Sequence, residues 1–127
     1  MRDIDKGVAE VARRDTKEKQ SFPLEGLSEN IANLLNQIQS DMFQKALDFR
    51  DSHITKVDSF EEFKQVLESK GGFISAHWDG TVETELKIKE LTKATIRCIP
   101  LEREDETGKC ILTGEASDGR VLFAKAY

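Results

Sequence analysis

The clearest pattern of apolar and polar residues lies between positions 26 and 53. Apolar side chains recur there at gaps of three and four residues, with polar residues between them. These apolar positions are Leu27, Ile31, Leu34, Leu35, Ile38, Met42, Ala46, Leu47 and Phe49. Such spacing is typical of one face of an amphipathic helix. It predicts a helix from about Gly26 to Arg50 or His53, which at ~1.5 Å per residue is roughly 35–40 Å long and can contact more than one packing surface.

A β-hairpin is predicted in front of this helix. Residues 8–14 alternate weakly between apolar and polar, residues 15–18 favour a turn, and residues 19–23 can form the returning strand. An isolated hairpin is marginally stable in water, and residues 1–7 supply no further strand. The hairpin is therefore an orphan, and we expect the chain to begin inside a larger folded unit.

Short helices and strands alternate in the second half of the chain. Ser59 and Glu62 are the two ends of a capping box that begins a helix, and the glycines at 71–72 stop it. A strand is predicted over residues 73–78. A third helix follows over residues 80–92, and we expect its apolar side chains to face the core. These side chains are Val82, Leu86 and Leu91.

The last third of the chain predicts three more strands and a loop. The strands are residues 94–99, 109–114 and 119–125, and the charged loop of residues 102–108 has little in its composition to order it. Together the elements predict an α+β fold. It consists of a long helix leading into a small mixed sheet with two packed helices, preceded by the orphan hairpin.

Net charge and the distribution of apolar residues argue against two classes of protein, free-standing nucleic-acid binders and membrane-spanning proteins. The 127 residues carry a formal charge of −5, which argues against a free-standing nucleic-acid binder, because such proteins neutralise phosphates with Lys and Arg. The one basic cluster, which contains Arg13 and Arg14, also contains Asp15 and Glu18, and this favours a solvated hairpin tip. No apolar run approaches the ~20 residues needed to cross a bilayer, and residues 1–3 do not start a signal peptide. We therefore expect a soluble, cytoplasmic protein.

Catalytic patterns are weak. The glycines at 71–72 lack the Lys and Ser/Thr of a phosphate loop, and the order Asp51, Ser52, His53 is a poor triad because adjacent residues point in different directions. Cys98 and Cys110 are expected to be reduced, with Cys98 a small buried side chain. These patterns favour a domain without catalytic residues of its own.

A metal site has only partial support. His77 and Trp78 favour a structural pair in which Trp78 covers the core and His77 bonds a loop carbonyl. A zinc site built from His77, Asp79 and Cys110 is conceivable, but structural zinc takes four thiolate or imidazole ligands. A metal-dependent enzyme would need bound zinc with an open position.

Several blocks of the chain resemble, in order, the C-terminal part of prolyl-tRNA synthetases of the archaeal/eukaryotic-like type, members of class II. Residues 2–4 and 11–16 resemble the end of the anticodon-binding domain. The blocks that resemble the zinc-binding-type C-terminal domain are residues 49–54, 70–73, 76–78, 94–100 and 120–127. The resemblance implies three parts: an anticodon-domain remnant (1–25), a connecting helix (26–56) and the C-terminal domain (57–127).

The resemblance implies a non-catalytic piece of an enzyme that joins proline to tRNA(Pro) with ATP and Mg. The piece would brace the anticodon-binding and catalytic domains, and Tyr127 would anchor it between domains. It would bind tRNA weakly, through Arg13 and Arg14. The whole enzyme would be a homodimer and the fragment a monomer. A stand-alone acidic domain that binds partner proteins is the alternative.

The resemblance also bears on zinc. In family members that bind zinc, four cysteines stand where this chain has Asp79, Thr84, Cys110 and Thr113. One carboxylate, two hydroxyls and one thiolate make a poor zinc cage. We therefore expect a metal-free variant whose loops are held by hydrogen bonds and packing.

Overall fold

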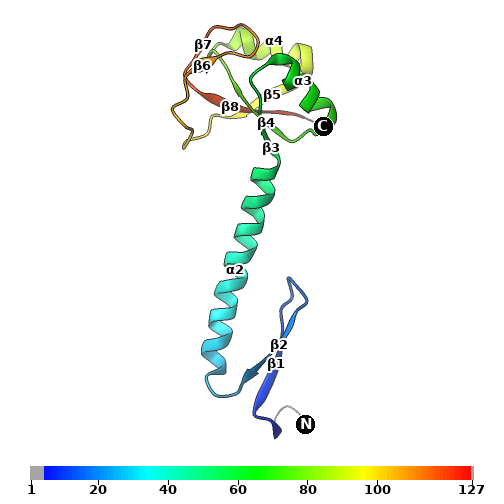
Figure 1. Cartoon of the computed structure of the whole chain (residues 1–127), viewed down its shortest axis with the longest axis vertical. Coiled ribbons are helices and arrows are strands. Elements are labelled where there is room, and N and C mark those ends of the chain that lie inside the picture. Colours follow the sequence, from blue (N-terminus) through cyan, green and yellow to red (C-terminus); the bar gives the residue numbers. More distant parts are fainter. Residues whose placement is uncertain (1–4, 127) are drawn as a thin grey trace. The chain divides into compact units, whose positions relative to one another are not determined.

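The computed structural model describes residues 5–126, and contacts divide the chain into two compact units, one up to Asp48 and one from Phe49 onward (Figure 1). The units are described one at a time. The predicted α+β class is confirmed: the described residues form helices together with short strands, four of which make a small mixed sheet. Within the described residues no helix is both long and apolar enough to cross a membrane.

The first unit contains the predicted hairpin. Strands β1 (Val8–Ala12) and β2 (Lys19–Pro23) pair antiparallel, with Ala12 opposite Lys19 beside the turn. The turn closes through a hydrogen bond of 2.8 Å from the backbone N–H of Arg13 to the carbonyl of Glu18. The side chain of Arg13 reaches Asp41 at 2.8 Å, which ties the hairpin to the long helix.

The long helix α2 (Leu27–Ser52) is confirmed within the predicted limits. None of its residues is buried, and Leu35, Met42 and Phe43 are each about 60% exposed, at 61%, 59% and 65%. Packing within the described residues therefore leaves part of the apolar face of the helix open to solvent.

The second unit is built on a four-stranded sheet with the order β3-β4-β8-β5 (Figure 1). Strand β3 runs parallel to β4, and β8 runs antiparallel to both β4 and β5. A separate two-stranded ladder, β6-β7, lies in the loop region before β8. The bounds of these strands are β3 (Ile54–Lys56), β4 (Phe73–His77), β5 (Ala94–Cys98), β6 (Gly108–Lys109), β7 (Ala116–Ser117) and β8 (Arg120–Lys125).

Helices α3 (Phe60–Ser69) and α4 (Val82–Thr92) add buried side chains to the core, as do Val57 and Ile111 outside the helices and strands. Phe63 of α3 and Ile88 of α4 are fully buried, and the ring of Phe63 meets that of Phe123 edge to face at 5.2 Å. Burying a side chain of this kind stabilises a fold by about 1.5–3 kcal/mol. The capping box is observed in part: Ser59 Oγ accepts from the N–H of Glu62 at 3.2 Å, while Glu62 reaches back to the N–H of Asp58 rather than that of Ser59.

The prediction of which residues of the third helix face the core is wrong. Val82, Leu86 and Leu91 are 62%, 58% and 58% exposed, whereas Thr84 and Ile88 are buried. The hydroxyl of Thr84 donates to Asp79 in the preceding loop at 2.7 Å. That contact turns the face carrying positions 84 and 88, one helical turn apart, toward the core, and it turns Val82 and Leu86 outward.

The strand predictions near the end of the chain are partly wrong. Cys98 is exposed, because β5 shifts register between Ile96 and Cys98 where it pairs with β8. The predicted strand over 109–114 ends at Lys109, and the next residues fold into a turn closed by the N–H of Gly114 and the carbonyl of Cys110 at 2.9 Å. Strand β3 was not predicted.

Candidate functional site

The four positions where zinc-binding family members have cysteines lie in two segments, one with Asp79 and Thr84 and one with Cys110 and Thr113, here called the two knuckle loops. Asp79 joins the two loops by hydrogen bonds. Its Oδ1 accepts hydrogen bonds from the N–H and the hydroxyl of Thr81, at 3.0 and 2.8 Å. Its Oδ2 accepts from the hydroxyl of Thr84 at 2.7 Å and from that of Thr113 at 2.9 Å. Two of the other three positions, Thr84 and Thr113, thus donate directly to the carboxylate of Asp79.

The electrostatics keep Asp79 ionised. Burial alone raises the pKa of this carboxyl, but the hydrogen bonds from Thr84, Thr81 and Thr113 favour the charged form and outweigh it, so the pKa falls to about 2. The group is therefore a carboxylate at neutral pH, and its two oxygens accept four hydrogen bonds.

Cys110, the fourth position, is only 3% exposed and is a free thiol. It lies in the second loop, where its N–H donates to the carbonyl of Glu115 at 2.8 Å. Within residues 5–126, no group of three or more His, Cys, Asp or Glu side chains is arranged to hold a metal. Structural zinc takes thiolate and imidazole ligands. These four positions offer a single thiol, and their two hydroxyls already donate to the carboxylate, so the set does not fit zinc.

His77, the remaining candidate ligand, is directed elsewhere. It is 4% exposed, and its Nδ1 lies 3.1 Å from the hydroxyl of Ser117, so its partner is a hydroxyl and not the predicted carbonyl. Gly108 packs directly on the ring: a Cβ at that position would lie 2.3 Å from Nε2. Trp78 packs against the core as predicted, with Nε1 donating to the carbonyl of Thr81 at 3.0 Å.

Arg120, at the start of β8, holds the loop that was expected to lack order. Its guanidinium donates twice to Glu106, at 2.9 and 3.1 Å, and once to the carbonyl of Val57 at 2.8 Å. It also contacts Asp58 and the carbonyl of Ser75. Hydrogen bonding to Arg120 lowers the pKa of Glu106, against the effect of burial. This clasp was not predicted, because its partners lie far apart in sequence.

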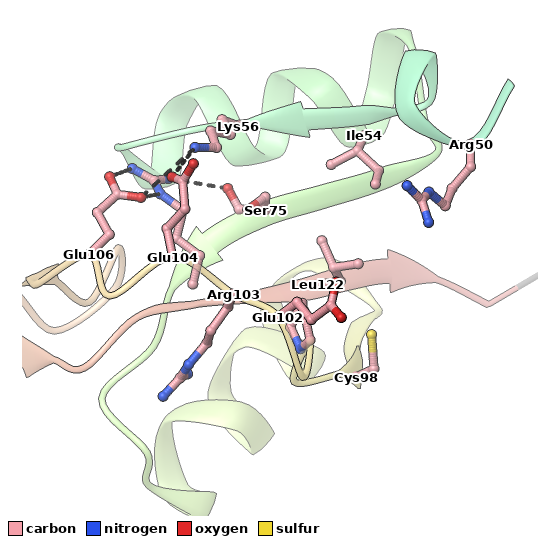
Figure 2. A pocket seen from close by; sticks show the side chains of 12 residues that line it. Arg50, Ile54, Lys56, Ser75, Cys98, Glu102, Arg103, Glu104, Glu106 and Leu122 are labelled. Atoms are coloured by element: carbon pink, nitrogen blue, oxygen red, sulfur yellow. Dashed lines mark hydrogen bonds and ion pairs between the residues drawn. The ribbon is translucent and has the colours of Figure 1, made fainter. Parts of the chain in front are cut away.

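A groove of about 550 Å³ lies next to the clasp, on the sheet face opposite Ile74 and Phe123. Ile54, Ser75 and Leu122 line it from three adjacent strands. Figure 2 shows Arg50 at one end of the groove and Lys56, Glu104 and Glu106 at the other, with Cys98 along the β5 side. The groove therefore combines apolar side chains with charges of both signs.

The two arginines predicted to contact tRNA, Arg13 and Arg14, differ in their exposure and in their partners. Arg13 is engaged by two carboxylates, Asp15 at 2.7 Å and Asp41 at 2.8 Å, and its side chain is 12% exposed. The hydrogen bond from Arg13 lowers the pKa of Asp15 to about 2. Arg14 is exposed. Tyr127, the predicted interdomain anchor, lies outside the described residues.

Fold and site together define a small α+β domain in which one carboxylate joins two loops by hydrogen bonds. Residues 60–127 match the family model described as "Prolyl-tRNA synthetase, C-terminal". The chain belongs to this family of prolyl-tRNA synthetase C-terminal domains.

Known proteins extend this match over nearly the whole chain. It is 65% identical over 126 residues to a proline–tRNA ligase of Flavobacterium psychrophilum and 60% identical to that of Flavobacterium johnsoniae. In each case 99% of this chain and 26% of the relative are covered, so the chain spans about a quarter of the length of these relatives.

Solved structures agree. The chain is similar to prolyl-tRNA synthetase from Cryptosporidium parvum in complex with L-proline and AMP, with a TM-score of 0.89 and 29% identity. The alignment covers 99% of this chain and 27% of that one. A second structure of the same enzyme, with halofuginone and AMPPNP, gives a TM-score of 0.91.

Proposed function

We propose that this chain is the C-terminal, non-catalytic part of a synthetase that joins proline to tRNA(Pro) with ATP and Mg, and that it braces the anticodon-binding and catalytic domains. The observation that carries the proposal is the 65% identity to a proline–tRNA ligase over 99% of the chain. Such identity extends through both units, hairpin and sheet alike. The chain by itself is expected to form no prolyl-adenylate.

The bracing role draws support from surfaces that the described residues leave open. Val82 and Leu86 of α4 are more than half exposed, and Leu101 is fully so. The groove beside Arg120 adds Ile54 and Leu122. Exposed apolar surface of this kind marks interaction sites, and the relatives are about four times as long as this chain. The remaining polypeptide of the synthetase is the proposed partner.

A chimera tests this role. The 126 matching residues of the Flavobacterium psychrophilum ligase are deleted in one variant and replaced by this chain in another. The deletion is expected to lower aminoacylation and thermal stability, and the replacement to restore both. A chimera that is as folded as the native ligase yet as inactive as the deletion would refute the proposal.

The finer family assignment belongs to the same proposal. The archaeal/eukaryotic-like type is supported by the likeness to the enzyme of Cryptosporidium parvum over 99% of the chain. The whole synthetase is proposed to be a homodimer and the isolated chain a monomer. The synthetase is proposed to act in the cytoplasm, where translation consumes aminoacylated tRNA.

Two site proposals follow from the geometry. The knuckle works without zinc, because its positions offer one thiol and a carboxylate that is already hydrogen-bonded. Any contact with tRNA is weak and falls mainly to Arg14, because Arg13 is neutralised by Asp15 and Asp41.

A further inference from the structure

We infer that the carboxylate of Asp79 replaces a metal ion as the cross-link of this domain: it gathers the two knuckle loops by accepting hydrogen bonds from both. The inference rests on the proposed zinc-free state and adds the group that takes over the task. In a zinc knuckle, anionic ligands converge on a cation. Here the polarity is reversed, and neutral donors converge on an anion.

The carboxylate is saturated. An ionised carboxylate offers about four lone-pair sites, and Asp79 has four donors, two on each oxygen. Oδ1 takes both of its bonds from Thr81, and Oδ2 takes one from Thr84 and one from Thr113. With these sites filled, a cation could bind Asp79 only by displacing hydrogen bonds that are already made.

The four bonds divide into local and long-range ones. Thr81 and Thr84 belong to the same loop as Asp79 and to the start of α4, where Thr81 is the N-cap residue. They fix the orientation of the carboxylate within its own loop. Thr113 lies 34 positions away and brings the second loop with it. The bond between Asp79 and Thr113 is therefore the side-chain cross-link between the loops, beside the backbone bond of 3.2 Å from the N–H of Ile111 to the carbonyl of His77. The other three bonds of Asp79 hold its carboxylate in place.

Thr113 is itself fixed by its turn. Its hydroxyl oxygen accepts from the N–H of Glu115 at 3.3 Å while its proton goes to Asp79. The same turn is closed by the N–H of Gly114 on the carbonyl of Cys110 and by the N–H of Cys110 on that of Glu115. Loss of the cross-link should therefore speed hydrogen exchange at the amides of Cys110 and Gly114.

Amide hydrogen exchange on the whole 127-residue chain tests the inference. The variants are Asp79→Asn, Thr113→Val and the double variant, with Thr107→Val, an exposed threonine of the 102–108 loop, as the matched control. Each single variant is expected to speed exchange of the Cys110 and Gly114 amides roughly tenfold, the lower end for a hydrogen bond to a charged group. The double variant should be no faster than the faster single one, and the control should match the native chain.

Two results would overturn the inference. One is unchanged exchange in Thr113→Val, which keeps the local bonds of Asp79 and so should fold even if Asp79→Asn does not. The other is a double variant in which the two accelerations multiply, because independent effects exclude a shared bond. A parallel sample with one equivalent of zinc separates the claims: protection of these amides by zinc in the native chain refutes the zinc-free state, whatever the variants do.

Discussion

Arg120 and Glu106 form a two-point ion pair, with guanidinium nitrogens 2.9 and 3.1 Å from the two carboxylate oxygens. The pair closes the 102–108 loop over one end of the sheet, beside the ring of His77, whose Nε2 lies 3.8 Å from Glu106. One side chain at the start of β8 thereby connects the loop, β4 and the segment before α3. The loop has few apolar residues, so polar contacts hold it: the clasp, the ion pair of Glu104 with Lys56 at 3.3 Å, and the pairing of Gly108 with Ser117.

Arg120→Lys should therefore destabilise the domain. A lysine ammonium cannot present two parallel N–H groups to Glu106 and also reach the carbonyl of Val57. We expect a loss of about 2 kcal/mol in the free energy of unfolding by chemical denaturation, in the range for breaking a part-buried hydrogen-bonded pair. Arg97→Lys, at an exposed position of β5, is the matched control. Equal stability of the two variants would contradict the clasp.

The same pair predicts a pH dependence. The pKa of Glu106 is lowered below its ordinary 4.5 by its bond to Arg120. A depressed carboxyl pKa contributes stability that is complete above the unfolded value and is lost as the pH falls through the folded one. The difference in stability between native and Glu106→Gln chains should thus be largest above about pH 5. It should shrink as the pH falls below the ordinary value of 4.5 and through the lowered pKa of Glu106. A difference that stays constant from pH 7 to 3 would show that the charge of Glu106 plays no part.

Gly108→Ala should be costly. The new Cβ would lie 2.3 Å from Nε2 of the buried His77 ring, so the ring or the β6-β7 ladder must move. Overpacking of this kind costs about 1–3 kcal/mol, and we expect a lower Tm in thermal unfolding. The double variant Gly108→Ala/His77→Ala should show less than the sum of the two single losses. Strict additivity would mean that the two residues do not press on each other.

The sequence-based predictions were best where local physics decides. The limits of α2 and α3 follow from strong helical periodicity and from the Ser59 cap, which are local. They failed where distant contacts decide. Thr84 and not Val82 faces inward because of a bond to Asp79, and the three residues of β3 form a strand only through their parallel pairing with β4.

The candidate site shows the same division. Asp79, Thr84 and Thr113 were singled out through the family resemblance, and hydrogen bonds join Asp79 to the two threonines. The Arg120–Glu106 clasp and the partner of His77 could not be predicted, since a polar residue in a loop gives no indication of which distant side chain it will meet. The prediction that Cys98 is buried was wrong, because a register shift in β5 changes which of its side chains face the core.

The knuckle geometry predicts that a metal site can be restored. Replacing Asp79, Thr84 and Thr113 by cysteine, with Cys110 in place, supplies four thiols at positions of which three are now joined by hydrogen bonds. Tetrahedral four-thiolate sites bind zinc and cobalt(II) strongly. The variant should take up one equivalent of cobalt(II) with thiolate-to-cobalt absorption. Asp79→Cys alone is the control, and equal uptake by both would contradict the geometry.

The measurement that tests the central claim most directly is the zinc content of the native chain purified without chelator, with Cys110→Ser prepared in parallel. A knuckle held by Asp79 predicts less than about one-tenth of an equivalent in both proteins, because structural zinc sites are filled stoichiometrically. One equivalent in the native chain that disappears in Cys110→Ser would contradict the account, since Cys110 would then be a ligand and the hydrogen-bonded carboxylate could not be the cross-link.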